Sequence, residues 1–303
     1  MKILLAPILG LVLALPCPAK IRLEQGAASL KVYRGELLVT EYRTDNFVPY
    51  LYPLVAPSGQ SLTRHFPMKK GVANEEPDHP HHRSFWFCHG DVNGYDFWHS
   101  KDAKTKMAHQ SFEAVGEDSF SVRLAWQHDD TTLLDEKRRY RFSQPTSESL
   151  LIEVFSTLTA ETDVTFGDTK EGSFALRVCP TLRHEGKVAQ GTILNSEKQT
   201  NGSAWGKRAR WVSYQGPDPV GNPSAVTMMD HPSNHNHPTH WHARTYGLLA
   251  ANPFGEKSFT KKGNGAYTLQ KGKSMTQKYA LLLTSGTITA EEIEKIYEGF
   301  AKP

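Results

Sequence analysis

Short runs of alternating or β-branched residues recur along almost the whole chain, and they constrain its fold more than any other feature. Examples are "SLKVYRG", "SFSVRLAWQH", "SLLIEVFSTLT" and "KYALLLTS". Clusters of Gly, Asn, Asp, Pro and Ser separate these runs, which is the pattern of antiparallel strands joined by turns. We therefore expect an all-β fold. The number of strands favours a large antiparallel β-sandwich over a jelly roll or a barrel.

The last part of the chain, "TAEEIEKIYEGFAK", has the pattern of an amphipathic helix. Thr289 and Glu292 have the spacing of a capping box at its start. Four apolar side chains share one face at helical spacing: Ile293, Ile296, Tyr297 and Phe300. We expect a C-terminal helix that packs on the outside of a sheet.

The first 19 residues have the organisation of a secretory signal peptide. Lys2 precedes an apolar run from Ile3 to Leu15, and cleavage is predicted after Ala19. The run is shorter than the roughly 20 residues of a membrane-spanning helix. We therefore expect a periplasmic or secreted protein with no stable membrane insertion after cleavage. The alternative is a lipoprotein signal in which Cys17 is lipidated.

Residues 20–303 are predicted to form a single β-sandwich domain. They contain no long Pro/Ser linker, internal repeat or low-complexity tract, and the hydrophobic content of the chain, 38%, is enough to fill a core. The formal net charge of +3 becomes +2 when Lys2 is removed with the signal peptide. Nucleic acids and anionic membrane surfaces select for a concentrated basic face, so neither is an expected partner.

Two cysteines, Cys88 and Cys179, remain after the signal peptide. An oxidising compartment would permit a disulfide between them, and two buried free thiols are the alternative. The chain has no CxxC motif and no zinc-ribbon spacing.

Histidines are distributed very unevenly along the chain. Eleven of the 14 lie in two segments, residues 65–99 and residues 231–242. In the first segment, "DHPHHR" is too polar and too restricted by its proline for the interior of a strand, so we expect a loop that leads into the apolar strand "SFWFC". The second segment also runs from a His-rich loop into an apolar strand, "YGLLAA". Two loops built alike suggest one shared site at the rim of the sandwich.

The strand "SFWFC" and the turn after it are interpreted as structural. Alternation places Phe85, Phe87 and His89 on one face and the residues between them on the other. Both faces are bulky, which predicts a strand buried on both sides. "DVNGYD" resembles a calcium loop, but its glycine comes too early and no bidentate glutamate follows. We interpret Asn93 and Gly94 as a two-residue hairpin turn.

The polar segments favour acid/base chemistry on a polar substrate, because histidine titrates near neutrality. We expect His81 and His82 to be the proton-transfer pair, with Glu171 or His242 assisting. Glu171 belongs to a polar turn, "FGDTKEGSFALRV", which would supply the carboxylate missing from the His-rich loops. Guanidinium and aromatic groups are suited to sugar hydroxyl and carboxylate groups. The predicted substrate-binding residues are Arg64, His79, Arg83, Trp98, Lys170, Arg177, His240 and Arg244.

A metal site is a second interpretation of the same histidines. Two HxH spacings that extended backbone could direct at one ion occur among His79, His81, His237, His240 and His242. Pro80 favours polyproline geometry, however, so the histidines beside it need not point the same way. The predicted ligands of a divalent metal, iron or copper, are His79, His81, His237 and His240. The sequence leaves the cofactor undetermined.

Four long segments resemble a secreted bacterial family labelled "methane oxygenase PmoA". They are "PYLYPLVAPSGQSLTRHFPM", "DHPHHRSFWFCHGDVNGYDFW", "GDTKEGSFALRV" and "HWHARTYGLLAANPFG". The resemblance covers nearly the whole mature chain, and it implies a β-sandwich similar to galactose mutarotases, in bacteria that degrade complex polysaccharides. "LQKGKSMTQKYALLL" also resembles the closing strands of that fold. The family has no settled catalytic residues to carry over.

Three functional hypotheses follow from these observations. The first is an exported carbohydrate-active enzyme, an epimerase, lyase or hydrolase, that acts on a sugar or oligosaccharide by histidine and carboxylate catalysis. The second is a metal-dependent oxidoreductase or oxygenase, as the family label suggests. The third is a non-catalytic glycan-binding module, in which aromatic platforms matter more than histidines and binding changes little between about pH 5 and 8.

Overall fold

The structure is a computed structural model that describes residues 19–99 and 102–302. The predicted signal peptide therefore lies outside the described residues except for Ala19, and so does the alternative lipidation site Cys17. Within the described ranges, no helix has both the length and the apolar character needed to cross a membrane.

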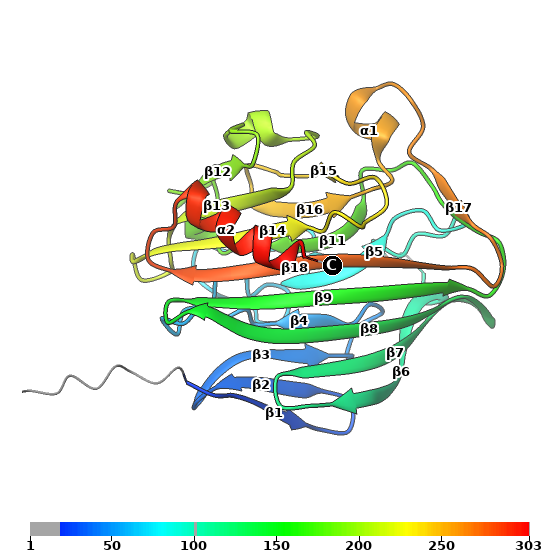
Figure 1. Cartoon of the computed structure of the whole chain (residues 1–303), viewed down its shortest axis with the longest axis horizontal. Coiled ribbons are helices and arrows are strands. Elements are labelled where there is room, and N and C mark those ends of the chain that lie inside the picture. Colours follow the sequence, from blue (N-terminus) through cyan, green and yellow to red (C-terminus); the bar gives the residue numbers. More distant parts are fainter. Residues whose placement is uncertain (1–18, 100–101, 303) are drawn as a thin grey trace, which may run out of the picture.

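Two large antiparallel sheets make up most of the structure (Figure 1). Sheet 1 has the spatial order β1 (Ile21–Gln25), β2 (Leu30–Arg34), β3 (Leu37–Arg43), β4 (Tyr50–Tyr52), β5 (Phe85–His89), β11 (Gly172–Arg177), β16 (Leu248–Asn252) and β15 (His240–Trp241). Sheet 2 has the order β12 (Thr192–Asn195), β13 (Trp211–Pro217), β14 (Pro223–Asp230), β18 (Ser274–Ser285), β9 (Ser149–Ala160), β8 (Thr131–Thr146), β7 (Ser119–His128) and β6 (Thr105–Val115).

Smaller elements complete the described chain. A two-stranded ribbon pairs β10 (Val164–Phe166) with β17 (Tyr267–Leu269). The helices are the short α1 (Glu256–Thr260), the C-terminal α2 (Ala290–Phe300) and two 3₁₀ turns, η1 (Pro180–Leu182) and η2 (Asn201–Ala204).

The two sheets pack face to face through large aromatic side chains. The ring centroids of Phe87 in sheet 1 and Trp126 in sheet 2 are 5.5 Å apart, and those of Phe174 and Tyr279 are 4.3 Å apart. All four rings are buried, so their apolar area stabilises the contact between the sheets. The predicted all-β fold, a large antiparallel β-sandwich, is confirmed.

The C-terminal helix α2 packs on the outer face of sheet 2, over β14 and β18 (Figure 1). Its capping box is formed: the Thr289 hydroxyl accepts from the Glu292 amide at 3.2 Å, and the Glu292 carboxylate accepts from the Thr289 amide at 2.8 Å. The helix buries Ile293, Tyr297 and Phe300 against the sheet, with Ile296 partly buried beside them. The predicted helix and its apolar face are confirmed.

The strand β5 and the turn that follows it are also as predicted. Every residue of β5 is buried, and Phe87 faces the core between the sheets. Asn93 and Gly94 have φ values of 53° and 84°, and Val92 and Tyr95 pair across them. Two successive positive φ values are those of a type I′ hairpin turn, for which Asn-Gly is the preferred sequence.

Both remaining cysteines are buried free thiols, which is the second of the two alternatives left open by the sequence. Burial raises the pKa of Cys88 and of Cys179. A thiol with a raised pKa stays protonated, so neither side chain is a reactive nucleophile.

A buried ion pair lies between the two sheets. Arg138 and Glu136 on β8 are 1% and 0% exposed, and the Arg138 Nε donates to the Glu136 carboxylate at 2.6 Å. The same carboxylate accepts from Trp126 Nε1 at 2.8 Å and from Ser156 Oγ at 2.6 Å. The guanidinium also lies over the ring of Phe87, 5.1 Å from its centroid. The desolvated charges are therefore paired and hydrogen-bonded, as a buried pair requires.

Removal of the buried arginine should be far more costly than removal of an exposed one. We expect Arg138→Met to lower the free energy of unfolding by about 3–5 kcal/mol, because it leaves the Glu136 carboxylate buried without its counter-charge. The matched control is Arg123→Met, which removes the 2.7 Å contact of an exposed arginine with Asp135 and should cost at most about 1 kcal/mol. Urea denaturation of both variants measures the two losses, and equal losses would contradict the prediction.

Candidate functional site

The "DHPHHR" loop folds over the outer face of sheet 1. Because Phe87 points into the core, its neighbour Trp86 on β5 points outward. The His82 ring of the loop stacks on Trp86, with centroids 5.4 Å apart and planes 20° apart. The candidate site consists of this loop and of the neighbouring strands β5 and β11, which contact it through Trp86 and Arg177.

A carboxylate between two buried arginines fixes this loop. Asp78 forms an ion pair with Arg64 and a second one, at 3.2 Å, with Arg177 of β11. The Asp78 carboxylate also accepts from His79 Nδ1 at 2.9 Å when that nitrogen carries a proton. Arg64 Nη2 donates to the His79 carbonyl oxygen at 3.1 Å. The Arg64 and Arg177 side chains are 2% and 1% exposed, so the loop covers two buried cations.

Asp78, Arg64 and Arg177 shift one another's pKa values. Burial alone would raise the pKa of Asp78, but Arg177, the bond from His79 and Arg64 outweigh it and lower the pKa to about 2. Burial and the neighbouring Arg64 lower the pKa of Arg177 to about 10, which Asp78 opposes. All three groups are therefore charged at neutral pH.

His82 lies at the centre of a stack of rings. Its ring is parallel to that of His79, with centroids 4.8 Å apart, and edge-on to that of His81 at 4.4 Å. Arg177 Nη1 lies 3.3 Å from His82 Nδ1. Burial, followed by the nearby His81 and Arg177, lowers the pKa of His82 far below its ordinary value. The predicted role of His82 in a proton-transfer pair does not fit this environment, because its ring cannot take up a proton near neutral pH.

The pKa of His81 is lowered less than that of His82, so of these two imidazoles His81 is the better candidate for a general base. Its side chain makes no hydrogen bond to any described residue, so a ring nitrogen is available. Burial, His99 and His79 lower its pKa to about 4, against the opposing effect of Glu171. The ring is therefore neutral at pH 7 and can accept a proton.

His242 provides a second neutral imidazole. Its Nδ1 lies 3.0 Å from the carbonyl oxygen of Lys170, so Nδ1 carries the proton and Nε2 keeps its lone pair. Burial lowers the pKa of His242 to about 4, and Glu171 is the strongest opposing group. Glu171 thus acts electrostatically on both His81 and His242. Glu171 therefore opposes the lowering of the pKa of both of the other predicted catalytic residues.

Glu171 is placed by a close approach of two backbones. The amide of Gly90 donates to the Glu171 carbonyl oxygen at 2.7 Å. A Cβ on residue 90 would lie only 2.8 Å from the Glu171 Cβ, so a glycine is required there. Lys170 pairs with the Glu171 carboxylate at the rim of the site.

Three residues near the loop were missed in the sequence. Asp96 accepts from the His99 amide at 2.9 Å and lies 2.8 Å from His99 Nδ1, and the rings of His99 and His81 are 4.6 Å apart. Tyr246 stacks on His79 with centroids 5.6 Å apart. Asp96 and His99 stand in the same His-rich segment as His81, and this proximity in sequence was the available signal.

The predicted substrate-binding residues divide into exposed and buried groups. His79 is 43% exposed, and Lys170 and Arg244 are also accessible. Trp98 is fully buried against Trp86 and its Nε1 is sealed from solvent, so its predicted contact with substrate does not fit. The predicted substrate contacts of Arg64 and Arg177 do not fit either, because both side chains are buried and paired with Asp78. Arg83 is partly buried, and its guanidinium lies over the ring of Tyr50.

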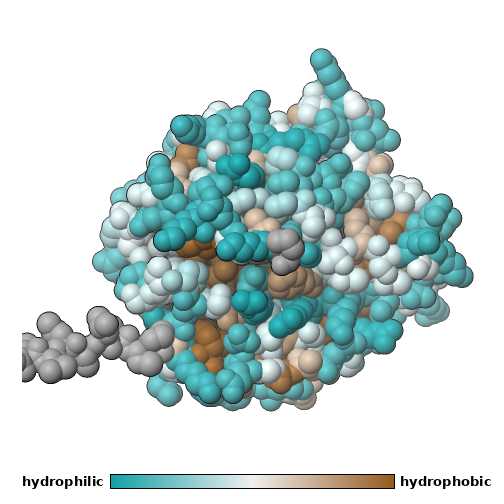
Figure 2. All heavy atoms as spheres, in the orientation of Figure 1, coloured by the Kyte–Doolittle hydropathy of each residue, from teal (hydrophilic) through white to brown (hydrophobic). Residues whose placement is uncertain are grey.

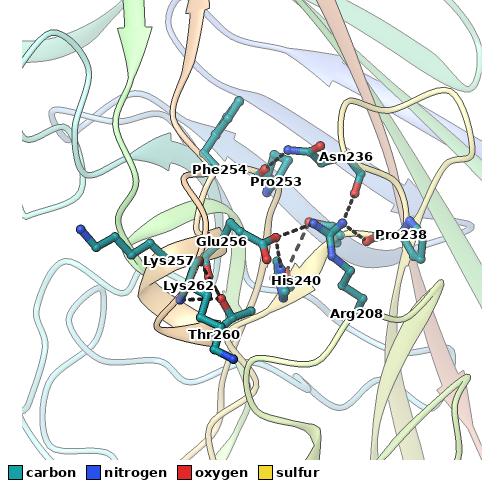
Figure 3. A network of polar contacts seen from close by, with 12 residues as sticks. Arg208, Asn236, Pro238, His240, Pro253, Phe254, Glu256, Lys257, Thr260 and Lys262 are labelled. Carbon is teal, nitrogen blue, oxygen red and sulfur yellow. Dashed lines mark hydrogen bonds and ion pairs between the residues drawn. The ribbon is translucent and has the colours of Figure 1, made fainter.

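Only part of the second His-rich segment reaches this site. His240 lies in a separate network, in which its Nε2 is 2.9 Å from Glu256, its Nδ1 is 2.8 Å from the Gly206 carbonyl, and Glu256 pairs with Arg208 at 2.7 Å (Figure 3). Both ring nitrogens are engaged, so His240 ties β15 to α1 rather than binding substrate. His237 is engaged by Asp230 at 2.8 Å.

The predicted metal ligands are not brought together. His237 and His240 are engaged by different carboxylates, and among the described residues no group of three or more His, Cys, Asp or Glu side chains is arranged to hold a metal ion. The metal-dependent interpretation of the two HxH spacings therefore has no support from the arrangement of these residues.

A pocket of about 830 Å³ lies elsewhere, between α2 and the outer face of sheet 2. Its lining includes Leu151, Glu153, Ile288 and Ile296 and contains no histidine. Figure 2 shows this face of the molecule as mostly hydrophilic, with hydrophobic atoms exposed between the polar side chains. The predicted catalytic residues His81, Glu171 and His242 stand in segments next to strands of sheet 1, whereas this pocket lies against sheet 2.

Comparison with known proteins identifies the family. A family model described as a family of unknown function (DUF6807) matches residues 29–298. The chain belongs to this family. No curated protein sequence matches the chain significantly. Membership of the DUF6807 family does not assign an activity, and the resemblance to the PmoA label stays a prediction.

Three solved structures show how distant the structural likeness is. Heparan sulfate lyase HepC from Pedobacter heparinus is 8% identical, with a TM-score of 0.38 over 86% of this chain and 34% of the lyase. This chain therefore spans about a third of that protein. A GalM/aldose epimerase homologue from C. elegans (9%, TM-score 0.37) and a galactose mutarotase-like protein from Clostridium acetobutylicum (9%, TM-score 0.34) each match over 88% of this chain and 99% of their own.

The buried neutral histidines predict how stability depends on pH. His89, like His81 and His242, has a pKa lowered to about 4, mainly by burial. Unfolded histidines titrate near 6.5, so the unfolded state binds more protons between about pH 6.5 and 4. Above about pH 6.5 these histidines are neutral in both the folded and the unfolded state, so they cost the fold nothing. We expect the free energy of unfolding to fall as the pH drops from 6.5 to 4.

Urea denaturation across this range measures the effect. His89→Gln keeps a side-chain N–H for the Gly167 carbonyl, which His89 Nε2 contacts at 2.8 Å, but it cannot titrate. The variant should therefore show a shallower pH dependence than the wild type. Identical slopes for the two proteins would contradict the prediction.

Proposed function

We propose that the chain is an exported carbohydrate-active enzyme that transfers protons on a sugar or oligosaccharide. The observation that carries this proposal is the partly buried His81 ring, which makes no hydrogen bond to a described residue and lies 4.4 Å from the ring of His82 and 4.6 Å from that of His99. A neutral imidazole accepts a proton, and a nearby carboxylate stabilises the imidazolium that forms. The reaction classes that need such groups are those of epimerases, lyases and hydrolases.

The surroundings of these groups favour a polyhydroxylated substrate. The exposed or partly exposed residues around them carry both donors and acceptors, including His79, Lys170, Arg244 and Asp96. Tyr246 stands among these residues, with its ring stacked on His79 and over the guanidinium of Arg177, which lies 4.4 Å from the ring centroid. The donors and acceptors around the imidazoles of His81 and His242 match the hydroxyl groups of a sugar.

Substitution of either imidazole tests the proposal. We expect His81→Gln and His242→Gln each to lower kcat/KM by about 100-fold or more, because each removes a ring that takes up a proton. The matched control is His235→Ala, in the second His-rich segment, whose ring packs on Phe254 and Tyr267 away from this group. A screen of periplasmic glycans, followed by product analysis, measures turnover. Full activity in both Gln variants, or binding without turnover, would overturn the proposal.

The pH dependence of the reaction gives a second test. A base with a pKa of about 4, as for His81, is unprotonated at every pH above about 5. We therefore expect kcat/KM to stay level from about pH 5 to 7 and to fall only near pH 4. Tryptophan fluorescence at each pH shows whether the protein is still folded. A fall in kcat/KM centred near 6.5 would contradict this assignment of the base.

A further inference from the structure

The tautomer of His82 is fixed by its neighbour. Arg177 Nη1 lies 3.3 Å from His82 Nδ1, and a guanidinium has donors but no acceptor. Nδ1 must therefore accept this bond, and the proton of the neutral ring must be on Nε2. Arg177 is itself held by Asp78, so the position of the donor is fixed by an ion pair.

The ring of His82 is also unable to change its charge near neutral pH. It is buried between His79 and Trp86, and four groups that can carry positive charge act on it: His79, His81, Arg64 and Arg177. Burial is the largest cause of its lowered pKa, and these groups add to it. His82 therefore remains a neutral donor while neighbouring groups gain and lose protons.

The Nε2–H of His82 has no acceptor within the described chain. No described residue accepts a hydrogen bond from it, and although His82 is only 1% exposed, its Nε2 is not among the fully buried atoms without a partner, which include the Nε atoms of Arg64 and Arg177. An N–H group in a largely buried ring is costly to leave without a partner. The acceptor must therefore come from outside the chain, on the side where His79 and His81 reach the surface.

We infer that His82 is a fixed, uncharged donor for a carbonyl oxygen of the substrate, and that the substrate is a sugar with a free ketone or aldehyde group next to a C–H bond. This inference rests on the proposed function and narrows it to one substrate class. The rings of His81 and His82 are 4.4 Å apart, so one ligand can meet both, with its C–H at His81 and the adjacent carbonyl oxygen at His82. A neutral donor beside a neutral base suits a carbonyl oxygen, and Arg177, the guanidinium that contacts His82, already has Asp78 as its counter-charge.

The step conserves atoms and electrons without a further reagent. His81 takes the proton from the carbon next to the carbonyl, and the electron pair of that C–H bond forms a carbon–carbon double bond. The π pair of the carbonyl moves to its oxygen, and the His82 Nε2–H stabilises the negative charge that develops there. The electron pair on oxygen then re-forms the carbonyl. In one outcome the carbon–carbon double bond takes the proton back from His81, which exchanges the hydrogen on that carbon. In the other, this double-bond pair forms a new double bond to the next carbon, whose C–O bond breaks with its pair on the leaving oxygen, and His81 gives that oxygen the proton.

Exchange of carbon-bound hydrogen in D₂O tests the inference. The probes are D-fructose and dihydroxyacetone, which present a ketone, and methyl α-D-glucopyranoside and gluconate, which present neither a ketone nor an aldehyde. We expect the wild-type protein to accelerate deuterium incorporation, followed by proton NMR, next to the carbonyl of the ketoses only. His82→Phe keeps a ring on Trp86 but removes the donor, and it should lower the exchange rate by about 100-fold or more. His82→Gln keeps an N–H near the position of Nε2 and should restore part of that loss.

The outcomes separate this inference from the proposed function. No exchange with either ketose, or full exchange in His82→Phe, overturns the inference. Turnover of a glycan that depends on His81 but leaves no deuterium on carbon overturns the inference and leaves the proposed function standing. Absence of both turnover and exchange overturns both.

The ¹⁵N NMR spectrum of the wild-type protein gives a measurement that does not depend on how the variants fold. We expect His82 to show a protonated Nε2 and an unprotonated Nδ1 at every pH from about 5 to 8. Arg177→Met removes the donor to Nδ1, and the Nδ1 signal should shift in that variant, since Arg177 is a positioning residue. A His82 ring protonated at Nδ1, or one that titrates in this range, overturns the inference.

Discussion

The pairing of one carboxylate with two buried guanidinium groups holds the candidate site together. Arg64 and Arg177 are almost fully buried, and two neighbouring cations in such a place would be strongly unfavourable alone. Asp78 supplies one negative charge that both guanidinium groups share, and it stands in the loop that carries the histidines. The loop is therefore held on sheet 1 by electrostatics. The tautomer of His82 and the exposure of its neighbours follow from that attachment.

Most of the fold could be predicted because its signals are local. Alternating runs specify strands, Asn93-Gly94 specifies a turn with two positive φ values, and the Thr289/Glu292 pair specifies a helix start. Each of these depends on residues within a few positions of one another. The order of strands in the two sheets, in contrast, depends on contacts between distant segments, and the sequence showed only that a large sandwich was required.

The candidate site could be predicted only in part, because burial and tautomer are tertiary properties. His81, Glu171 and His242 were identified from polar loops, and their catalytic role stays a prediction. His82 looked equivalent to His81 in sequence, but an arginine from β11 gives it a different chemical character. His240 and His242 have the spacing of metal ligands, yet a glutamate in α1 engages the first and a backbone carbonyl engages the second. A histidine count cannot distinguish these cases.

The position of β18 in sheet 2 has a consequence for when the protein can fold. It is the last strand in the chain, yet it lies between β14 and β9 and is the sole link between the two halves of that sheet within the described chain. Its first residue, Ser274, contacts Thr159, 115 residues earlier. A partly synthesised chain would present two unpaired strand edges, which invite association with other chains. The two halves of sheet 2 can therefore join only after β18 has been made, although all the other strands of the sheet are synthesised earlier.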